Sequence, residues 1–116
     1  MNEQILESIK TAIGPSASYD VFDPQIVMYI NTCFGVLRQL GAGPIEGFRL
    51  TNADASWDSW SSDQNLQDLA KSFIKFKVQL MFDPPSNSFT LEHYNKLISE
   101  LEWRINIMCD PSTTFS

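Results

Sequence analysis

The chain has 116 residues, of which 43% are hydrophobic and 12% aromatic, and its formal net charge is −6. This length suits one domain with a single core, and the apolar content excludes a chain that is disordered throughout. The acidic balance argues against a protein that grips nucleic acid through its phosphates, because such proteins concentrate Lys and Arg on one face.

Cysteine usage and the N-terminus indicate the compartment. Two cysteines, Cys33 and Cys109, do not make a disulfide framework or a cysteine-based metal site, so a reducing environment is expected. The N-terminus lacks the pattern of a secretory signal, and no stretch approaches the length of a membrane span. We therefore expect a soluble protein that is made in the cytoplasm, without a membrane partner.

Two helices are predicted in the first forty residues. Apolar residues recur at helical spacing from Ile5 to Ile13, and Gly14 and Pro15 end this helix. Asp23 and Pro24 supply the cap and the first turn of a second helix, which reaches about residue 40. Its expected core positions are Ile26, Val27, Ile30, Cys33, Phe34, Leu37 and Leu40.

Residues 41–64 form a long irregular segment, within which residues 47–51 could form a short strand or one arm of a β-hairpin. Trp57 and Trp60 indicate that this segment is held in place. Two interpretations are open: both tryptophans cover one end of the helical bundle, or they form a docking element that meets a partner.

A central helix is predicted from Leu66 to Phe82, because its apolar residues fill a wide arc and its polar residues only a narrow face. Lys77 falls within the apolar arc. We expect its stem to lie along the core and its ammonium to reach the rim or a carboxylate, for which Glu102 is the candidate.

A last helix is predicted from Thr90, as its N-cap, to about Met108. Trp103 points away from its core stripe, and Ile107 lies one turn further along the same face. This pair is either a second contact surface, for example with a neighbouring subunit, or a site covered by the long loop. The expected core stripe is Leu91, Tyr94, Leu97, Ile98, Leu101, Ile105 and Met108. Residues 1–108 are thus one helical domain, and residues 109–116 a flexible tail.

No arrangement of catalytic residues is evident. His93, the one histidine, lies off the core stripe, and no nucleophile elbow accompanies it. Asp54, Asp58 and Asp63 lack the spacing and the glycine of a calcium loop. We expect no enzyme, metal or cofactor; a small hydrolase using His93 and a loop aspartate is the weakest hypothesis.

Three segments together carry a family resemblance: Leu37–Arg49, Phe76–Pro85 and Glu100–Asn106. They resemble the head-tail connector, or adaptor, proteins of bacteriophages with long non-contractile tails. The resemblance implies an all-α bundle of about four helices that assembles into a roughly twelvefold ring beneath the portal protein. Such a ring completes the head, extends the DNA channel at the virion neck and offers a platform for the next connector, the stopper or a tail protein.

Related adaptors grip the portal and their neighbours through extended loops and terminal segments, which implies that role for residues 41–64 and for the tail. Genomic DNA would pass through the lumen without specific binding, because an acidic lumen repels phosphates. The alternative function is a monomeric phage-encoded module that engages a host protein through Trp57, Trp60 and the acidic loop. The expected interface residues are Phe48, Arg49, Trp57, Trp60, Trp103, Ile107 and Phe115.

Overall fold

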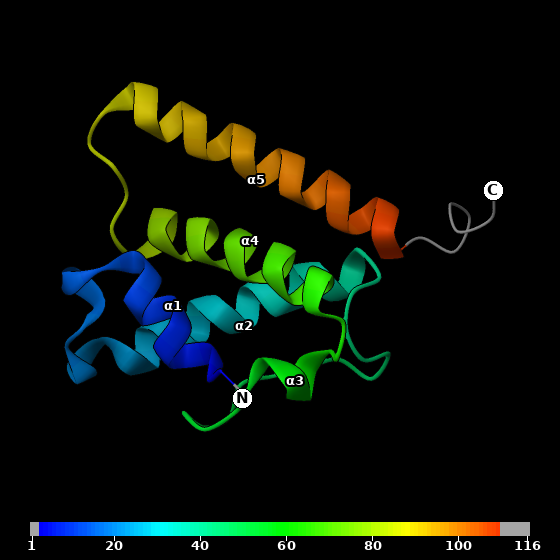
Figure 1. Cartoon of the computed structure of the whole chain (residues 1–116). Coiled ribbons are helices and arrows are strands. Elements are labelled where there is room, and N and C mark those ends of the chain that lie inside the picture. Colours follow the sequence, from blue (N-terminus) through cyan, green and yellow to red (C-terminus); the bar gives the residue numbers. More distant parts are fainter. Residues whose placement is uncertain (1–2, 110–116) are drawn as a thin grey trace.

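The computed structural model describes residues 3–109, and this part of the chain is helical, with no strand (Figure 1). The expected all-α architecture is confirmed. The elements are α1 (Ile5–Ile13), the 3-10 turns η1 (Pro15–Ala17) and η2 (Asp20–Phe22), α2 (Asp23–Gln39), α3 (Trp57–Trp60), α4 (Gln64–Phe82) and α5 (Ser88–Cys109). The four longer helices are the ones that the sequence predicts, and α3 adds a single turn inside the long loop.

Helix α4 is the centre of the fold, as its apolar pattern predicts. It packs against α1 and α2 on one side and against α5 on the other (Figure 1). Phe73, Ile74 and Val78 are fully buried between these layers. Burial on both sides explains why the polar face of this helix is so narrow.

Local hydrogen bonds determine where α4 and α5 begin. Asp63 caps α4, because its side chain accepts hydrogen bonds from the backbone amides of Asn65 and Leu66. Asn87 caps α5 by accepting from the amides of Phe89 and Thr90, at 2.8 and 3.2 Å. The cap of α5 is therefore Asn87 and not Thr90, and the helix begins three residues earlier than predicted.

A buried cation joins the end of α1 to the start of α2. The Lys10 ammonium lies 2.7 Å from the Asp23 carboxylate and 3.3 Å from that of Asp20, and the Lys10 side chain is only 6% exposed. The hydrogen bond with Asp23 raises the pKa of Lys10. This ion pair holds the two 3-10 turns between α1 and α2.

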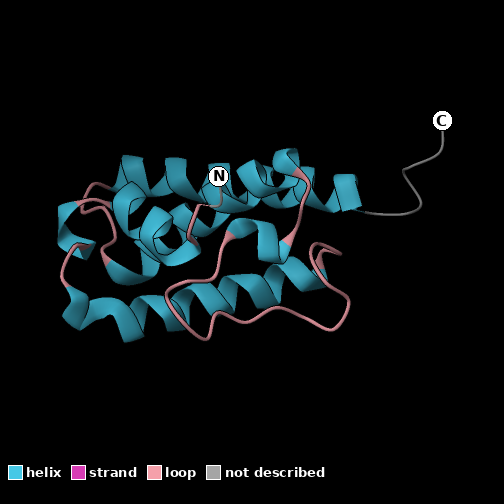
Figure 2. Ribbon diagram, turned by 60° about the horizontal axis from the view of Figure 1, so that its bottom comes forward, coloured by secondary structure: helices cyan, strands magenta, loops and turns pink. Residues whose placement is uncertain are grey.

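The long loop returns along α2 before it reaches α3 (Figure 2). Arg38 of α2 donates to the Ile45 carbonyl at 3.0 Å. Asn31, two turns earlier on α2, donates to the Leu50 carbonyl at 3.1 Å and accepts from the Leu50 amide at 2.6 Å. Residues 47–51 form no strand, and the backbone amide and carbonyl of Leu50 pair with the Asn31 side chain instead of with a strand partner.

The end of the loop is attached to the start of α1. The Ile5 amide donates to the Ala55 carbonyl at 2.9 Å, and the Trp57 amide donates to the Glu3 carbonyl at 3.0 Å. An isolated antiparallel bridge between residues 4 and 56 lies between these bonds, and it is the β-pairing in the described part of the chain. The β-structure of this loop is thus one bridge and not a hairpin.

Candidate interaction surfaces

The outer face of α5 carries an apolar pair, Trp103 and Ile107, which we call the α5 patch. Trp103 is 62% exposed and Ile107 is 38% exposed. Their spacing of four residues places them next to each other on the helix. The Glu100–Arg104 ion pair, with an N–O distance of 2.9 Å, runs along the same face. A large aromatic side chain beside charged groups is typical of a contact surface.

The α5 patch is exposed because α5 is covered on one side only. Ile98 and Ile105 are buried against α4, and Tyr94 packs edge-on against Phe76 of α4 with ring centroids 4.9 Å apart. The long loop reaches α5 near its last residue, where Cys109 lies against Gly41. Trp103 is therefore not covered by that loop, which excludes the second interpretation of its position.

The predicted core stripe of α5 is only partly correct. Ile98 and Ile105 are buried, but Leu91 and Met108 are 36% and 37% exposed. Both lie near the ends of α5, where α4 no longer covers it. In the single chain, α5 therefore buries only a narrow strip of its surface, which we call the shallow seat of α5.

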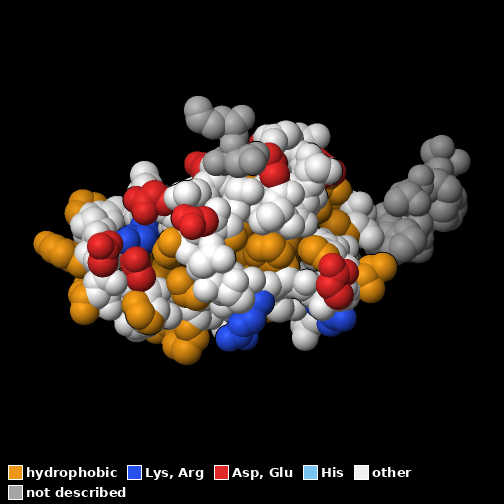
Figure 3. All heavy atoms as spheres, turned by 90° about the horizontal axis from the view of Figure 1, so that it is seen from below, with side chains coloured by type: hydrophobic (Ala, Val, Ile, Leu, Met, Phe, Trp, Pro, Cys, Tyr) orange, Lys and Arg blue, Asp and Glu red, His pale blue; other side chains and the backbone are white. Residues whose placement is uncertain are grey.

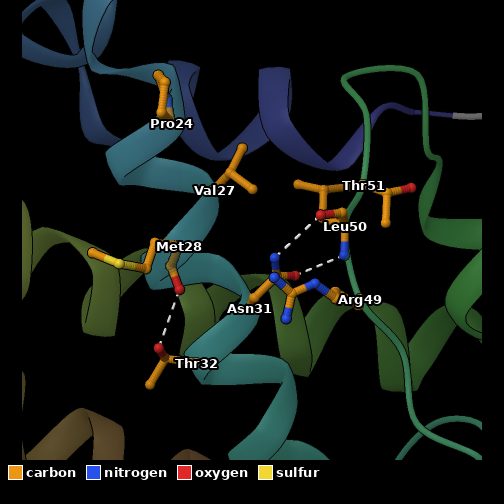
Figure 4. A pocket seen from close by; sticks show the side chains of 8 residues that line it. All are labelled: Pro24, Val27, Met28, Asn31, Thr32, Arg49, Leu50 and Thr51. Atoms are coloured by element: carbon orange, nitrogen blue, oxygen red, sulfur yellow. Dashed lines mark hydrogen bonds between the residues drawn. The ribbon is translucent and has the colours of Figure 1, made fainter.

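A groove of about 710 Å³ lies between α2 and residues 49–51 (Figure 4). We call it the α2 groove. Its lining residues are Pro24, Val27, Met28, Asn31, Thr32, Arg49, Leu50 and Thr51. The Asn31 clamp on Leu50 fixes the distance between its two walls. The groove is therefore a consequence of how the loop is attached to α2.

The α2 groove combines aliphatic side chains with polar groups and one cation. Val27 and Met28 supply aliphatic surface, and Met28 is 58% exposed. Thr32 donates its hydroxyl to the Met28 carbonyl at 3.1 Å, which leaves its oxygen free to accept a hydrogen bond. Arg49 is exposed and forms no ion pair with any residue from 3 to 109.

The expected interface role of Trp57 and Trp60 needs correction, because both side chains are buried, at 2% and 3% exposure. The Trp57 indole donates to the Ser8 hydroxyl of α1 at 2.9 Å. Trp60 packs on Phe34 with ring centroids 5.7 Å apart. The half-buried Phe48 packs on the Phe34 ring as well, with ring centroids 4.9 Å apart. These aromatic side chains hold the loop against the helical bundle. The alternative hypothesis of a host-binding module relied on exposed Trp57 and Trp60, so the structure does not support it.

Lys77 lies as its apolar surroundings predict, with its ammonium 5.9 Å from the centre of the Phe73 ring. It forms no ion pair with Glu102 in the described part of the chain, so that expected partner is not used. Nearby Cys33 is buried, and burial raises the pKa of its thiol to about 12. A thiol with this pKa is a packing group and not a nucleophile at neutral pH.

The remaining sequence-predicted candidates are His93 and the groups that could hold a metal ion. His93 is exposed on α5. Within residues 3–109, no three His, Cys, Asp or Glu residues are placed to hold a metal ion. None of the helices in this range combines the length and apolar character that crossing a membrane requires. Viewed from below, Lys and Arg side chains lie in separate groups and not in one basic field (Figure 3).

Some predicted interface residues cannot be placed in the structure, and some residues of the α2 groove were not predicted. Residues 110–116 of the predicted tail, Phe115 among them, lie outside the described residues, whereas Cys109 is the last residue of α5. Sequence reasoning named Arg49 but missed Met28 and Asn31. The available signal was Asn31 itself, a polar residue one helical turn from buried Phe34, since such an amide usually has a specific partner.

The chain matches one family model along most of its length. The model is described as phage connector protein, and it matches residues 5–112. No curated protein and no solved structure matches the chain. The family model covers all five helices, the α5 patch and the α2 groove.

Proposed function

Because this chain belongs to the phage connector protein family, we propose that it is a head-tail connector that forms a ring under the portal protein. Proteins of this family are structural and belong to the virion. In this proposal the ring has roughly twelve copies, extends the DNA channel and is the docking platform for the next connector, the stopper or a tail protein. The match over residues 5–112 is the observation that carries it.

The α5 patch is the proposed contact between neighbouring copies. A side chain as large as Trp103 gains free energy when a partner covers it, and tryptophan is common among residues that dominate binding. Its 62% exposure means that its truncation removes little of the contact area within one chain. Truncation of Trp103 should therefore weaken assembly and leave the fold intact.

The loop tip and the tail are the proposed contacts with the portal and the next protein. Ile45 is 89% exposed at the tip of the long loop, whose backbone is held by Arg38. A rigidly held apolar residue loses little entropy on binding, so it suits a docking contact. Residues 110–116 would add a second contact after α5, and this part of the proposal rests on the family role alone.

The channel is proposed to be acidic. Asp54, Asp58 and Asp63 lie in and around α3 and are exposed, and no Lys or Arg occurs between residues 50 and 70. If this segment faces the lumen, it repels DNA phosphates and lets the genome slide. Asp54→Lys should then slow DNA ejection in a salt-dependent way, whereas Asp54→Asn should have a smaller effect.

Copy number in purified virions tests the connector role directly. We expect quantitative mass spectrometry to find this protein at about one copy per portal subunit. Its absence from the virion would refute the structural role.

The interface is tested with two matched variants. Trp103→Ala should lower incorporation into particles while the free energy of unfolding of the isolated protein changes by less than about 1 kcal/mol. Phe89→Ala is the control, since Phe89 is 82% exposed on α5 but lies about 21 Å away along the helix. Equal loss of monomer stability and of incorporation with Trp103→Ala would place Trp103 in the core.

A further inference from the structure

We infer that the α2 groove of one copy receives the α5 patch of the neighbouring copy. This inference rests on the proposed ring and names the two surfaces that build it. It assigns a role to Met28, Arg49 and Thr32, which the fold of the single chain leaves at the surface.

The two surfaces lie on opposite sides of the molecule. Helix α4 separates α2 from α5 in Figure 1, and Figure 4 shows the α2 groove with α4 behind it. The α5 patch faces away from α4 on the other side, since Ile98 and Ile105 are the residues of α5 buried against α4. A closed ring with head-to-tail contacts requires two different and complementary surfaces on each subunit, placed so that one copy leads to the next.

The apolar chemistry of the two surfaces matches. Trp103 and Ile107 present an indole and an aliphatic chain, and Val27 and Met28 form an aliphatic wall. Methionine adapts its shape to an aromatic ring and makes favourable sulfur contacts with it. The 58% exposed Met28 side chain would lose much of its contact with water when the indole covers it.

The polar groups of the α2 groove fit an indole as well. A buried tryptophan N–H usually pairs with an acceptor. The Thr32 oxygen can accept while its hydroxyl donates to Met28, and Thr51 offers a second hydroxyl at the opposite wall. Trp103 in the groove would therefore bury its ring without leaving its N–H unsatisfied.

Charge favours a second copy as the occupant. Arg49 is the charged residue of the groove lining, and it has no ion-pair partner among residues 3–109. Helix α5 carries three glutamates against one Lys and one Arg, a net charge of −1. Glu102, directly before Trp103, has no ion-pair partner in the same range. Docking of α5 would bring these two unpaired charges of opposite sign together.

Disulfide cross-linking in assembled particles tests the inference. We would combine Met28→Cys and Ile107→Cys in a Cys109→Ser background, which leaves Trp103 in place and retains the buried Cys33. Oxidation should give a ladder of covalent oligomers, because each copy offers one cysteine to each neighbour. Each variant with only one of the two added cysteines should stay monomeric on a denaturing gel.

The outcomes separate this inference from the connector role. Dimers from Ile107→Cys alone would mean that two α5 patches face each other and would overturn the inference. Absence of a ladder in particles with a normal copy number would overturn it and leave the connector role intact. Absence of the wild-type protein from particles would overturn both.

A charge exchange tests the same contact without cysteines. Arg49→Glu should lower incorporation into particles by about tenfold or more, since it places like charges at the interface. Addition of Glu102→Arg should restore incorporation, and Glu102→Arg alone should lower it. If the losses of incorporation caused by Arg49→Glu and by Glu102→Arg simply add in the double variant, Arg49 and Glu102 do not contact each other.

Discussion

Gly43→Ala should destabilise the protein strongly, because Gly43 combines a restricted backbone with a close aromatic neighbour. Its φ is +91°, a conformation that costs an L-residue about 1–2 kcal/mol. A Cβ at this position would overlap the Trp60 Nε1 atom and lie 3.1 Å from two carbons of the same ring. Overpacking of this kind adds about 1–3 kcal/mol, so the expected total loss is about 2–5 kcal/mol.

Gly47→Ala is the matched control for the backbone term. Gly47 has nearly the same φ, +95°, but a Cβ there would meet only the Arg38 side chain, at 3.4 Å. That is an ordinary van der Waals contact with a flexible group. The expected loss is the backbone term alone, about 1–2 kcal/mol.

Urea unfolding followed by far-UV circular dichroism measures both changes. The difference between the two variants isolates the contact between Gly43 and Trp60. Equal losses for Gly43→Ala and Gly47→Ala would refute the argument that the buried Trp60 ring fixes the path of the loop.

Three further changes test other parts of the fold. Asn31→Asp removes the donor to the Leu50 carbonyl and places a carboxylate beside it, so urea unfolding should show a loss of about 1–3 kcal/mol; an unchanged midpoint would mean that the clamp is not needed. The pKa of Lys10 is raised above 10.5 by the hydrogen bond with Asp23, so stability from this ion pair is fully present below pH 10.5 and is lost as the pH rises through the higher folded value. The stability difference between wild type and Lys10→Met should therefore narrow above pH 10.5, and a constant difference would contradict this. Burial raises the pKa of Cys33 to about 12, so iodoacetamide at pH 8 should label this thiol only at the rate of unfolding, as measured in a Cys109→Ser background; rapid labelling of the folded protein would show that Cys33 is accessible.

The sequence predicts the helices well because their signals are local. The breaks at Gly14 and after Phe82, and the apolar arc of α4, are contained within single segments. The sequence predicts too late a start for α5 because Asn87 and Thr90 are both acceptable caps, and only the hydrogen bonds distinguish them.

The surfaces were harder to predict because exposure depends on which element covers which. Trp57, Trp60 and Trp103 all looked like candidate contacts, yet only Trp103 is exposed. A Ser8 hydroxyl from the far end of the chain satisfies Trp57, and no local pattern predicts a partner 49 residues away. The α2 groove is likewise formed by segments that are distant in sequence, so the helical pattern of α2 did not reveal it.

The shallow seat of α5 determines where the folded chain opens first. Helix α5 packs mainly on α4 and buries only Ile98 and Ile105, whereas α4 is packed against α1, α2 and α5, so amide hydrogens of α5 should exchange with solvent at a lower opening free energy than those of α4. A neighbour bound over Trp103 would slow exchange along α5 more than elsewhere. The last helix would then reach its full protection only in the assembled particle, and its exchange rate would report how far assembly has advanced.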